Sequence, residues 1–492
     1  MIEAALVAWF PITAVLFVLM RPHKAAACSL IFGVALLPAN RAIPLPILPD
    51  LTQYSVPVVA SMIMIAVKYP QRLIAAKPGT NGDFLILLMI FGALITNLTN
   101  GDVLVYGPKI KPAMTASDTV NDGLQLAFRW LLPFLIGRTV VRTAKEAVDV
   151  LVILALCGLA YVPFILVEFQ TGPIWHVLVY GSQPSPSTFW HSLRYGGFRP
   201  SVLMNHGLTL SVFMFHTVIA WVYLARARIR PLPVSSAPIA FVMLGVCAWF
   251  KTRSILIYAL ASLPMILVLR PRMQLRIAGT IAIVLLSYPF LRSIDMIPVQ
   301  TVAEIAEEYA GADAAQSFMQ RIDTEDEIIS HVAQRWWFGW GGYARYFLYD
   351  PLTGVPLSVM DGFWVMEFGQ GGVVRYALTF SFLIFPILFA WLHARRIEST
   401  FALRVICAMV WICVIRTWNL LPNSAVDPWH VFIGGAACSV AAYESRRRTV
   451  AKKEKAEPKP PPAPKDAEPR ESPPAADPEQ RPDSIAAGLL TR

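Results

Sequence analysis

Charged residues are scarce in this chain: they make up 15% of its 492 residues, whereas hydrophobic residues make up 56%. A soluble protein of this length does not need so much apolar surface, and apolar runs of bilayer length recur along the sequence. Runs such as 147–167 and 376–392 lack both the alternation of a strand and the polar face of a surface helix. The composition therefore argues against a soluble α/β enzyme and predicts an all-α polytopic membrane protein.

Cysteine is also scarce, and all six cysteines fall inside apolar runs: Cys28, Cys157, Cys247, Cys407, Cys413 and Cys438. The long loops contain none, so the sequence offers neither a disulfide framework nor a CxxC metal site. No His/Asp ligand spacing suggests a metal either, and we expect no metal and no cofactor. The N-terminus lacks a charged stretch before its first apolar run, which predicts a retained first span and not a cleaved signal.

What the chain has in abundance is apolar runs, which predict roughly 12–13 transmembrane helices. The expected spans are 3–20, 25–39, 55–68, 83–98, 119–137, 147–167, 207–224, 236–250, 254–269, 276–291, 372–392, 400–417 and 427–443. They divide the chain into an N-terminal transmembrane bundle (1–292), an external loop or cap (293–371), C-terminal transmembrane helices (372–445) and a tail (446–492). The tail is rich in Pro, Ala and Glu and cannot bury enough apolar area to fold, so we expect a disordered cytoplasmic segment.

The net charge of +10 is distributed unevenly between alternate loops. One set is short and rich in Lys and Arg; the other set, including 40–54, 99–118, 168–206 and 293–371, is long and poor in them. Cytoplasmic loops carry such an excess of basic residues, so this distribution predicts membrane orientation and gives no reason to expect a nucleic-acid partner. The C-terminus is then cytoplasmic and the segment 293–371 external, which is the periplasmic side in a Gram-negative bacterium.

The segment 293–371 is the one long stretch of mixed charge between the apolar runs. Its first part is helix-like and contains His331, a candidate base. Its second part, 336–343, holds Trp336, Trp337 and Trp340 among three glycines. Flat aromatic faces on a bendable backbone suit a sugar-binding wall, and they equally suit an interfacial aromatic belt. We therefore expect a helical cap with Trp336, Trp337, Trp340 and Trp364 as sugar-binding candidates.

Positive charges at the external ends of spans are unusual and need a reason. Lys251 and Arg253 occupy a very short external turn, and Arg416 lies at the external end of its span. Two interpretations remain open: these side chains reach toward lipid headgroups, or they form an anion clamp, for which the planar Arg fork is suited. Arg129 is a further candidate, although a structural helix–helix pair is an equal alternative.

The loop before the span 207–224 contains Arg199-Pro200 and Asn205-His206. Its glycines and proline predict irregular backbone, which is tolerated at membrane depth where it is buried or lines a cavity. Arg199 is a further candidate for binding an anion. His206 is either a capping residue or a base, and neighbouring arginines should lower its pKa and keep it neutral.

Two carboxylates, Asp361 and Glu367, precede the glycine-rich start of the span 372–392. They do not share one face of a regular helix, but a kinked start would aim both inward. Either is a candidate general base if partial burial raises its pKa. The alternative is that Asp361 caps the helix and Glu367 lies in its first turns.

Four motifs, taken together and in their order along the chain, resemble those of the O-antigen ligase and polymerase family. The resemblance covers about residues 190–395. The motifs are Arg199-Pro200 with Asn205-His206, Lys251-Thr252-Arg253-Ser254, Phe338-Gly339-Trp340-Gly341-Gly342, and Asp361-Gly362-Phe363-Trp364 followed by Gly369-Gln370-Gly371-Gly372. The resemblance implies a bacterial inner-membrane glycosyltransferase of type C architecture that takes a glycan from undecaprenyl diphosphate. Ligases of the family are expected to carry a His-Asn pair where Asp361-Gly362 stands here, which favours the polymerase branch.

The resemblance thus implies polymerisation of lipid-linked repeat units into a surface polysaccharide or exopolysaccharide, without a metal. Asp361 is the first candidate for the base, with His331, His206 and Glu367 behind it, and Arg253, Lys251, Arg199 and Arg416 are the candidates for binding the diphosphate. A flippase and a chain-length regulator are possible partners. The alternatives are an O-antigen ligase, which transfers the glycan to a lipid acceptor, and a lipid-glycan transporter, which should show pseudo-symmetric halves.

Overall fold

The computed structural model describes the chain except for residues 46–47, 195, 295, 358–360 and 457–492. It is 71% helical with almost no sheet, as the apolar runs predict. The chain separates into two units, Met1–Arg448 and Thr449–Arg492, and all that follows concerns the first. The predicted start of a disordered tail at 446 is wrong, because the last helix continues through Ala456; the rest of the tail lies outside the described residues.

The helices and strands, in chain order, are α1 (Ile2–Leu19), α2 (Pro22–Leu36), β1 (Ala42–Ile43), β2 (Leu51–Thr52), α3 (Ser55–Lys68), α4 (Pro70–Ala75), α5 (Asp83–Leu98), β3 (Leu104–Tyr106), β4 (Lys109–Lys111), α6 (Ala116–Leu126), the π-helix η1 (Ala127–Leu131), α7 (Leu132–Val140), α8 (Ala144–Thr171), α9 (Trp175–Tyr180), α10 (Thr188–Ser192), β5 (Leu193–Arg194), β6 (Gly197–Phe198), α11 (Gly207–Arg226), α12 (Ser236–Trp249), α13 (Arg253–Val268), α14 (Pro271–Leu286), α15 (Tyr288–Ser293), α16 (Val299–Ala310), α17 (Ala312–Val332), the 3₁₀-helix η2 (Ala333–Arg335), α18 (Phe363–His393), η3 (Ala394–Arg396), α19 (Thr400–Asn419) and α20 (Pro428–Ala456). The strands form only two-stranded antiparallel hairpins.

Among the described residues, five helices are long and apolar enough to cross a membrane: Ile2–Leu19, Ala144–Thr171, Gly207–Arg226, Phe363–Arg396 and Thr400–Asn419. Five of the other expected spans correspond to shorter apolar helices of 10–17 residues. The expected single span 119–137 falls within a continuous helical run, 116–140, in which the π-helix η1 joins α6 to α7 and contains Arg129.

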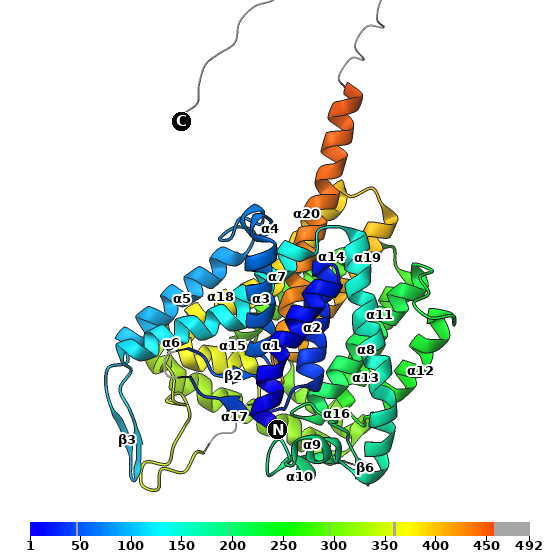
Figure 1. The fold of residues 1–492 in the computed structure, drawn as a ribbon. Helices are drawn as coiled ribbons and strands as arrows, with labels where there is room; N and C mark the ends of the chain where they lie inside the picture. The colour runs from blue at the N-terminus through cyan, green and yellow to red at the C-terminus, as the bar shows by residue number, and fades with distance from the viewer. Residues whose placement is uncertain (46–47, 195, 295, 358–360, 457–492) are drawn as a thin grey trace, which may run out of the picture. The chain divides into compact units, whose positions relative to one another are not determined.

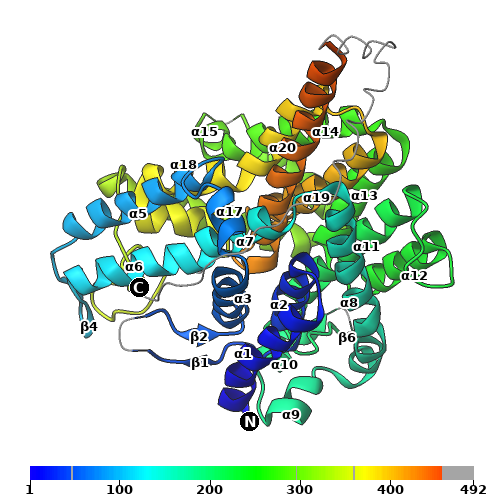
Figure 2. The same ribbon diagram turned by 45° about the horizontal axis from the view of Figure 1, so that its top comes forward.

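Two groups of helices make up the fold. In Figures 1 and 2, α1, α2, α8 and α11 lie on one side, and α5, α6 and α18 project to the other side. The first group shares a large apolar core with α19; the second packs Trp130, Phe363 and Trp364 against Ile328 and Val332 of α17. The predicted cap is therefore helical and shares a core with α18.

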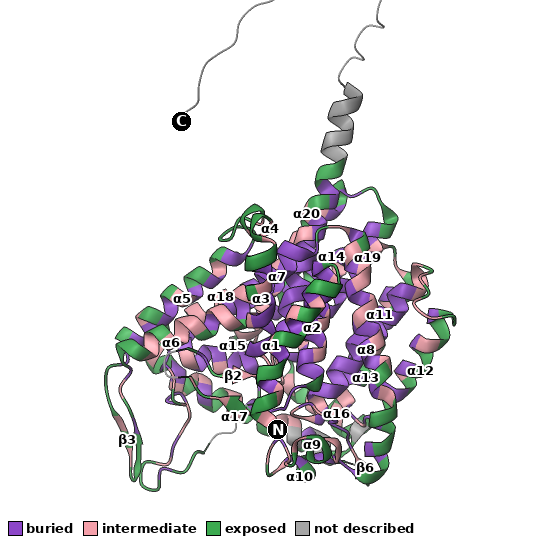
Figure 3. Cartoon of the chain, viewed as in Figure 1, coloured by how far each residue is buried: buried purple, intermediate pink, exposed green. Residues whose placement is uncertain are grey.

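Exposed apolar side chains cover the outer faces of several helices (Figure 3). On α1 they include Val7, Val15 and Val18, and on α13 Leu260 and Val268, each at least half exposed. Apolar faces of this extent are typical of a surface that meets lipid or another protein.

Hydrogen bonds join loops of the same predicted set. Among the basic loops, Arg272 Nη2 donates to the carbonyl of Ile397 (2.8 Å) and Arg404 Nη1 to that of Arg226 (3.0 Å). In the other set, Lys111 Nζ donates to the carbonyl of Tyr343 (2.8 Å). In Figure 1, α4 lies at the top of the view and β3, α9, α10 and β6 at the bottom, so segments of the two loop sets lie at different ends of the helices.

Candidate functional site

A break in α18 is the main irregularity of the fold. At Gly371 and Gly372 the backbone leaves helical geometry, and Gly372 has φ +65°. A Cβ on Gly372 would lie 2.5 Å from the carbonyl oxygens of Trp336 and Trp337. Gly339, with φ +63°, approaches from the other side: a Cβ there would lie 2.6 Å from the amide nitrogen of Gly372. Both positions therefore require glycine.

The loop 336–341 supplies the hydrogen bonds that the break removes from the helix. Four backbone bonds join them: Val373 N–H to Trp336 O (2.9 Å), Val374 N–H to Trp337 O (3.3 Å), Trp340 N–H to Gly369 O (3.0 Å) and Gly341 N–H to Gln370 O (2.9 Å). Buried backbone groups need such partners, so the break and the loop form one structural unit. The glycines among the tryptophans are thus explained by close backbone packing.

The hairpin β3–β4 and its flanks fasten this loop. Asp102 accepts from Arg335 (2.7 Å) and from Arg345 (2.9 Å), and these arginines hold the pKa of Asp102 below its usual value. The guanidinium of Arg345 is fully buried and also donates to the carbonyls of Asp102, Trp340 and Pro112. A buried arginine with four acceptors fixes the backbone around it.

The four tryptophans expected to bind sugar have different environments. Trp336 and Trp337 are 43% and 63% exposed. Trp340 is buried and stacks on the ring of His331 at 4.2 Å between centroids. Trp364 has no exposed surface, so its assignment to sugar binding is wrong, and the burial of Trp340 argues against it there too. Burial also lowers the pKa of His331, whose ring serves packing between the cap and the loop.

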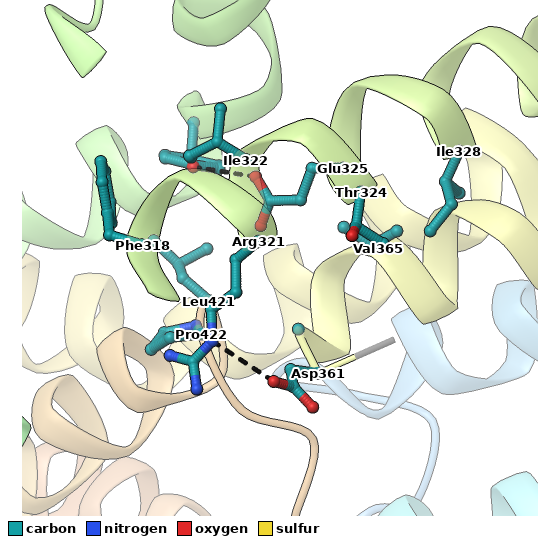
Figure 4. Close-up of a pocket in the computed structure, with 12 residues that line it drawn as sticks. Phe318, Arg321, Ile322, Thr324, Glu325, Ile328, Asp361, Val365, Leu421 and Pro422 are labelled. Carbon is teal, nitrogen blue, oxygen red and sulfur yellow. Dashed lines mark hydrogen bonds and ion pairs between the residues drawn. The ribbon is translucent and has the colours of Figure 1, made fainter. Parts of the chain in front are cut away.

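A cavity of about 200 Å³, here called the cap pocket, lies between α17, the start of α18 and residues 421–422 (Figure 4). Asp361 lies at this pocket and pairs with Arg321 of α17 at 3.3 Å (Nε to Oδ2); both side chains are 49% exposed. Figure 4 shows Arg321 reaching down toward Asp361, with Glu325 one turn further along the helix. Asp361 is accessible in this position, which the role of a base requires.

Glu325, which the sequence did not single out, is the second carboxylate of the cap pocket. Its oxygens accept from Trp364 Nε1–H (3.1 Å) and from the hydroxyl of Tyr288 (3.3 Å). Burial raises the pKa of Glu325 to about 7, while the two hydrogen bonds oppose the shift. A carboxyl that exchanges its proton near neutral pH is suited to acid–base chemistry. The signal was present in the sequence: Glu325 lies in the apolar stripe of α17, between Ile322 and Ile328.

Glu367 is not available as a base in this structure. It is 2% exposed, and its Oε2 lies 3.1 Å from Arg375 Nε and accepts from the Thr379 hydroxyl at 2.8 Å. These partners lie beyond the break, so Glu367 ties the two halves of α18 together. Its candidacy as a catalytic base is therefore wrong for this conformation. Glu367 does lie in the first turns of α18, as the alternative expected, but the capping position is held by Gly362 and not by Asp361.

Three of the other candidates gather at the hairpin β5–β6. His206 caps α11 by accepting from the amide of Leu208 (3.1 Å), and Arg199 Nη2 lies 3.5 Å from its Nε2. Lys251 Nζ donates to the carbonyl of Arg194 in the hairpin (3.4 Å). Burial, and then the charge of Arg199, lowers the pKa of His206 to about 4. The prediction of a neutral His206 among arginines is confirmed, together with its capping role.

Arg416 lies apart from this group, inside the helix core. It is 2% exposed and its Nη2 is 3.6 Å from Asp427 Oδ2, which also lies 3.5 Å from His430 Nδ1. It lines a small hollow of about 30 Å³, space enough for a water molecule. Buried in this way, Arg416 does not reach a lipid diphosphate, and its assignment to the clamp is wrong for this conformation.

The largest of the described cavities, about 950 Å³ and here called the outer cavity, is lined by α6, the π-helix η1 and two loops, from which residues 45, 48–50, 52, 54–55, 424–426 and 428 contribute. Arg129, Asn205 and Tyr54 are among its polar lining residues. The guanidinium of Arg129 lies 5.1 Å from the ring centre of Phe363, two residues after Asp361. π-turns inside helices often occur at functional sites, because they redirect a side chain.

The predicted residues therefore do not line one cavity in the described part of the chain. Asp361 belongs to the cap pocket, Asn205 to the outer cavity, and Arg199, His206 and Lys251 to the β5–β6 hairpin; Arg253 is the first, half-buried residue of α13. One loop connects the two larger sites: Leu421 and Pro422 line the cap pocket, and residues 424–426 and 428 line the outer cavity.

No group of three or more His, Cys, Asp or Glu side chains among the described residues has the geometry of a metal site. Comparison with known proteins adds no identification: no protein-family model matches the sequence, and no curated protein matches it.

Proposed function

We propose that the chain is a multi-pass membrane protein that polymerises glycans carried on undecaprenyl diphosphate. The five long apolar helices and the exposed apolar faces of α1 and α13 support the membrane location. The Lys/Arg-rich ends of the helices then face the cytoplasm, and the cap and both larger cavities lie at the opposite, external face.

The observation that carries the proposal is a pair of neighbouring cavities of different character that share a loop. The cap pocket, at about 200 Å³, has room for about one sugar ring and contains two carboxylates. The outer cavity, at about 950 Å³, is several times larger and contains a guanidinium in a π-turn. A glycan transferase needs both: a small site that activates one hydroxyl, and a large cationic site for a diphosphate-linked glycan.

In the proposed reaction, an acceptor hydroxyl attacks the anomeric carbon of the donor. Asp361 takes the proton as the new C–O bond forms, and the bond between the anomeric carbon and the diphosphate oxygen breaks. Arg129 stabilises the negative charge of the departing undecaprenyl diphosphate. Arg199, Lys251 and Arg253 remain candidates for holding the same group from the β5–β6 side of the structure.

The test is polymer formation by Asp361→Asn, using purified protein in lipid nanodiscs and a lipid-linked repeat unit as the sole glycan. We expect a loss of roughly 100-fold or more, because a positioned base contributes 10²–10⁴-fold to such a step. Asp323→Asn is the matched control, since Asp323 is an exposed carboxylate on the same helix as Arg321. Near-normal chain length in Asp361→Asn would remove the proposed base. In a second reaction of the unaltered protein with a lipid acceptor added, product on that acceptor alone would indicate a ligase.

A further inference from the structure

A further hollow lies at the other end of the helices, among the basic loops. It has a volume of about 180 Å³ and is walled by the α4–α5 connection, α7 and its following turn, and α20. Five cationic side chains line it: Arg72, Lys77, Arg138, Arg142 and Arg446. Within the described part of the chain, no Asp or Glu side chain lines it.

Among the described residues, Arg138 is the cation of this group that forms an ion pair, while the guanidinium of Arg72 lies 5.5 Å from the ring centre of Tyr69. The guanidinium of Arg138 pairs with the buried Asp83 and donates to the carbonyls of Ala76 and Thr80, which fixes the α4–α5 connection beside α7. Among the residues that the structure describes, the other four cations form no ion pair. The hollow therefore carries positive charge that no carboxylate of the described residues neutralises.

The carboxylates nearest in sequence are engaged elsewhere. Glu146 accepts from the backbone amides of Arg142 and Thr143 in the capping box of α8. Glu444 lies toward the amide of Ala144 (3.5 Å) and the guanidinium of Arg447 (3.7 Å). Their positions leave the charge of the hollow to an external anion.

A buried hydroxyl gives an independent indication of a ligand. Thr139 lines the hollow, is 1% exposed, and its Oγ1 has no hydrogen-bond partner among the described residues. A buried polar atom without a partner is costly and calls for a bound group or water. Phosphate oxygens accept from guanidinium and hydroxyl groups alike.

We propose that this hollow is a binding site for a phosphate-bearing group, held by Arg72, Lys77, Arg142 and Arg446 with the Thr139 hydroxyl as a further donor. The phosphate diester of an anionic phospholipid and a free phosphate share this chemistry. Basic pockets between helices at the cytoplasmic face bind anionic headgroups in this way. A bound phosphate would join the α4–α5 connection to α7 and α20, and it should stabilise the folded protein.

The experiment measures thermal unfolding of the full chain in neutral detergent, with phosphatidylglycerol, phosphatidylcholine or inorganic phosphate added. We expect phosphatidylglycerol to raise the midpoint and phosphatidylcholine not to. The triple variant Arg72→Gln/Lys77→Gln/Arg142→Gln should weaken the apparent affinity by about tenfold or more, because charge-assisted hydrogen bonds are lost. Thr139→Val, which changes no charge, should weaken it by a smaller factor.

The matched control is Arg228→Gln/Arg230→Gln/Arg276→Gln, which removes the same charge from exposed positions at the same end of the helices. If phosphatidylglycerol still stabilises this control variant, the result supports a built site. If both triple variants lose the stabilisation equally, the effect is a general attraction to headgroups and the proposal is overturned. A midpoint shift with inorganic phosphate and no lipid shows that free phosphate is enough to occupy the site. The absence of a shift with both phosphatidylglycerol and inorganic phosphate also overturns the proposal. None of these readouts depends on glycan transfer.

Discussion

Two long helices of this protein, α11 and α18, solve the same physical problem in different ways. α11 is continuous, and 89% of its membrane-length window is buried. α18 is broken at Gly371–Gly372, 44% buried, and completed by backbone bonds from the loop 336–341. A continuous helix satisfies its own amides and can act as scaffold, whereas a broken one depends on another segment. The break therefore links the cap to the helix that begins just after Asp361. A site that must bind and release substrate is well placed at such a link between two segments.

The largest expected effect comes from filling the break. Gly372→Ala places a Cβ at φ +65° and 2.5 Å from two carbonyl oxygens, so it should cost about 3 kcal/mol or more of unfolding free energy. The measurement is denaturant unfolding of the purified protein in detergent. Limited proteolysis should also show earlier cleavage within 336–343.

Gly245→Ala is the control for this comparison. Gly245 is an exposed glycine inside α12, and a Cβ there meets nothing within 4 Å. The substitution should therefore stabilise the protein by roughly 0.5–1 kcal/mol, through the better helix propensity of alanine. If both substitutions changed stability equally, the dependence of α18 on the loop would be disproved.

The next prediction concerns the pH dependence of the unfolding free energy, which distinguishes the cap pocket from the apolar core. Because the pKa of Glu325 is raised to about 7 in the folded state, the folded protein holds this proton more tightly than the unfolded chain. The resulting stability is complete below about pH 4.5, declines as the pH rises, and is lost above about 7. The unfolding free energy should thus fall by at most about 3 kcal/mol between pH 4.5 and pH 8.

Glu325→Gln keeps the hydrogen-bonding oxygen but cannot ionise, so this pH dependence should shrink. Glu327→Gln, at an exposed position two residues further along α17, should leave it unchanged. The comparison is made by unfolding titrations at both pH values. An unaltered slope in Glu325→Gln would show that another group carries the titration.

The two regions also differ in how far the sequence predicts them. Apolar runs locate α8, α11 and α19, because membrane-length helices depend mainly on local composition. The environment of Trp364 was missed, because its burial depends on Glu325 and Tyr288, which lie 39 and 76 positions earlier in the numbering. The glycines at 369, 371 and 372 predicted an irregular helix start, but its partner at 336–341 is a tertiary contact.

Arg416 and Arg129 illustrate the same limit within the candidate site. Both are single charges in apolar sequence, and hydropathy alone does not distinguish a structural role from a functional one for either. Only the fold distinguishes them: Arg416 is paired with Asp427 inside the core, and Arg129 lines the outer cavity from a π-turn. A π-turn leaves no clear trace in the pattern of residues 127–131.

The smallest expected effect uses one substitution at two places and predicts opposite signs. Ala344 has φ +54° in the tight turn beside Arg345, a conformation that costs an alanine about 1 kcal/mol. Ala344→Gly removes this strain but adds chain entropy to the unfolded state, so it should raise stability by less than about 1 kcal/mol. Ala160→Gly, at an exposed position inside α8, should lower stability by about 1 kcal/mol. Paired unfolding curves measure both changes. If Ala344→Gly lowered stability as much as Ala160→Gly, the loop would hold no such strain and would differ from the scaffold helices only in its hydrogen bonds.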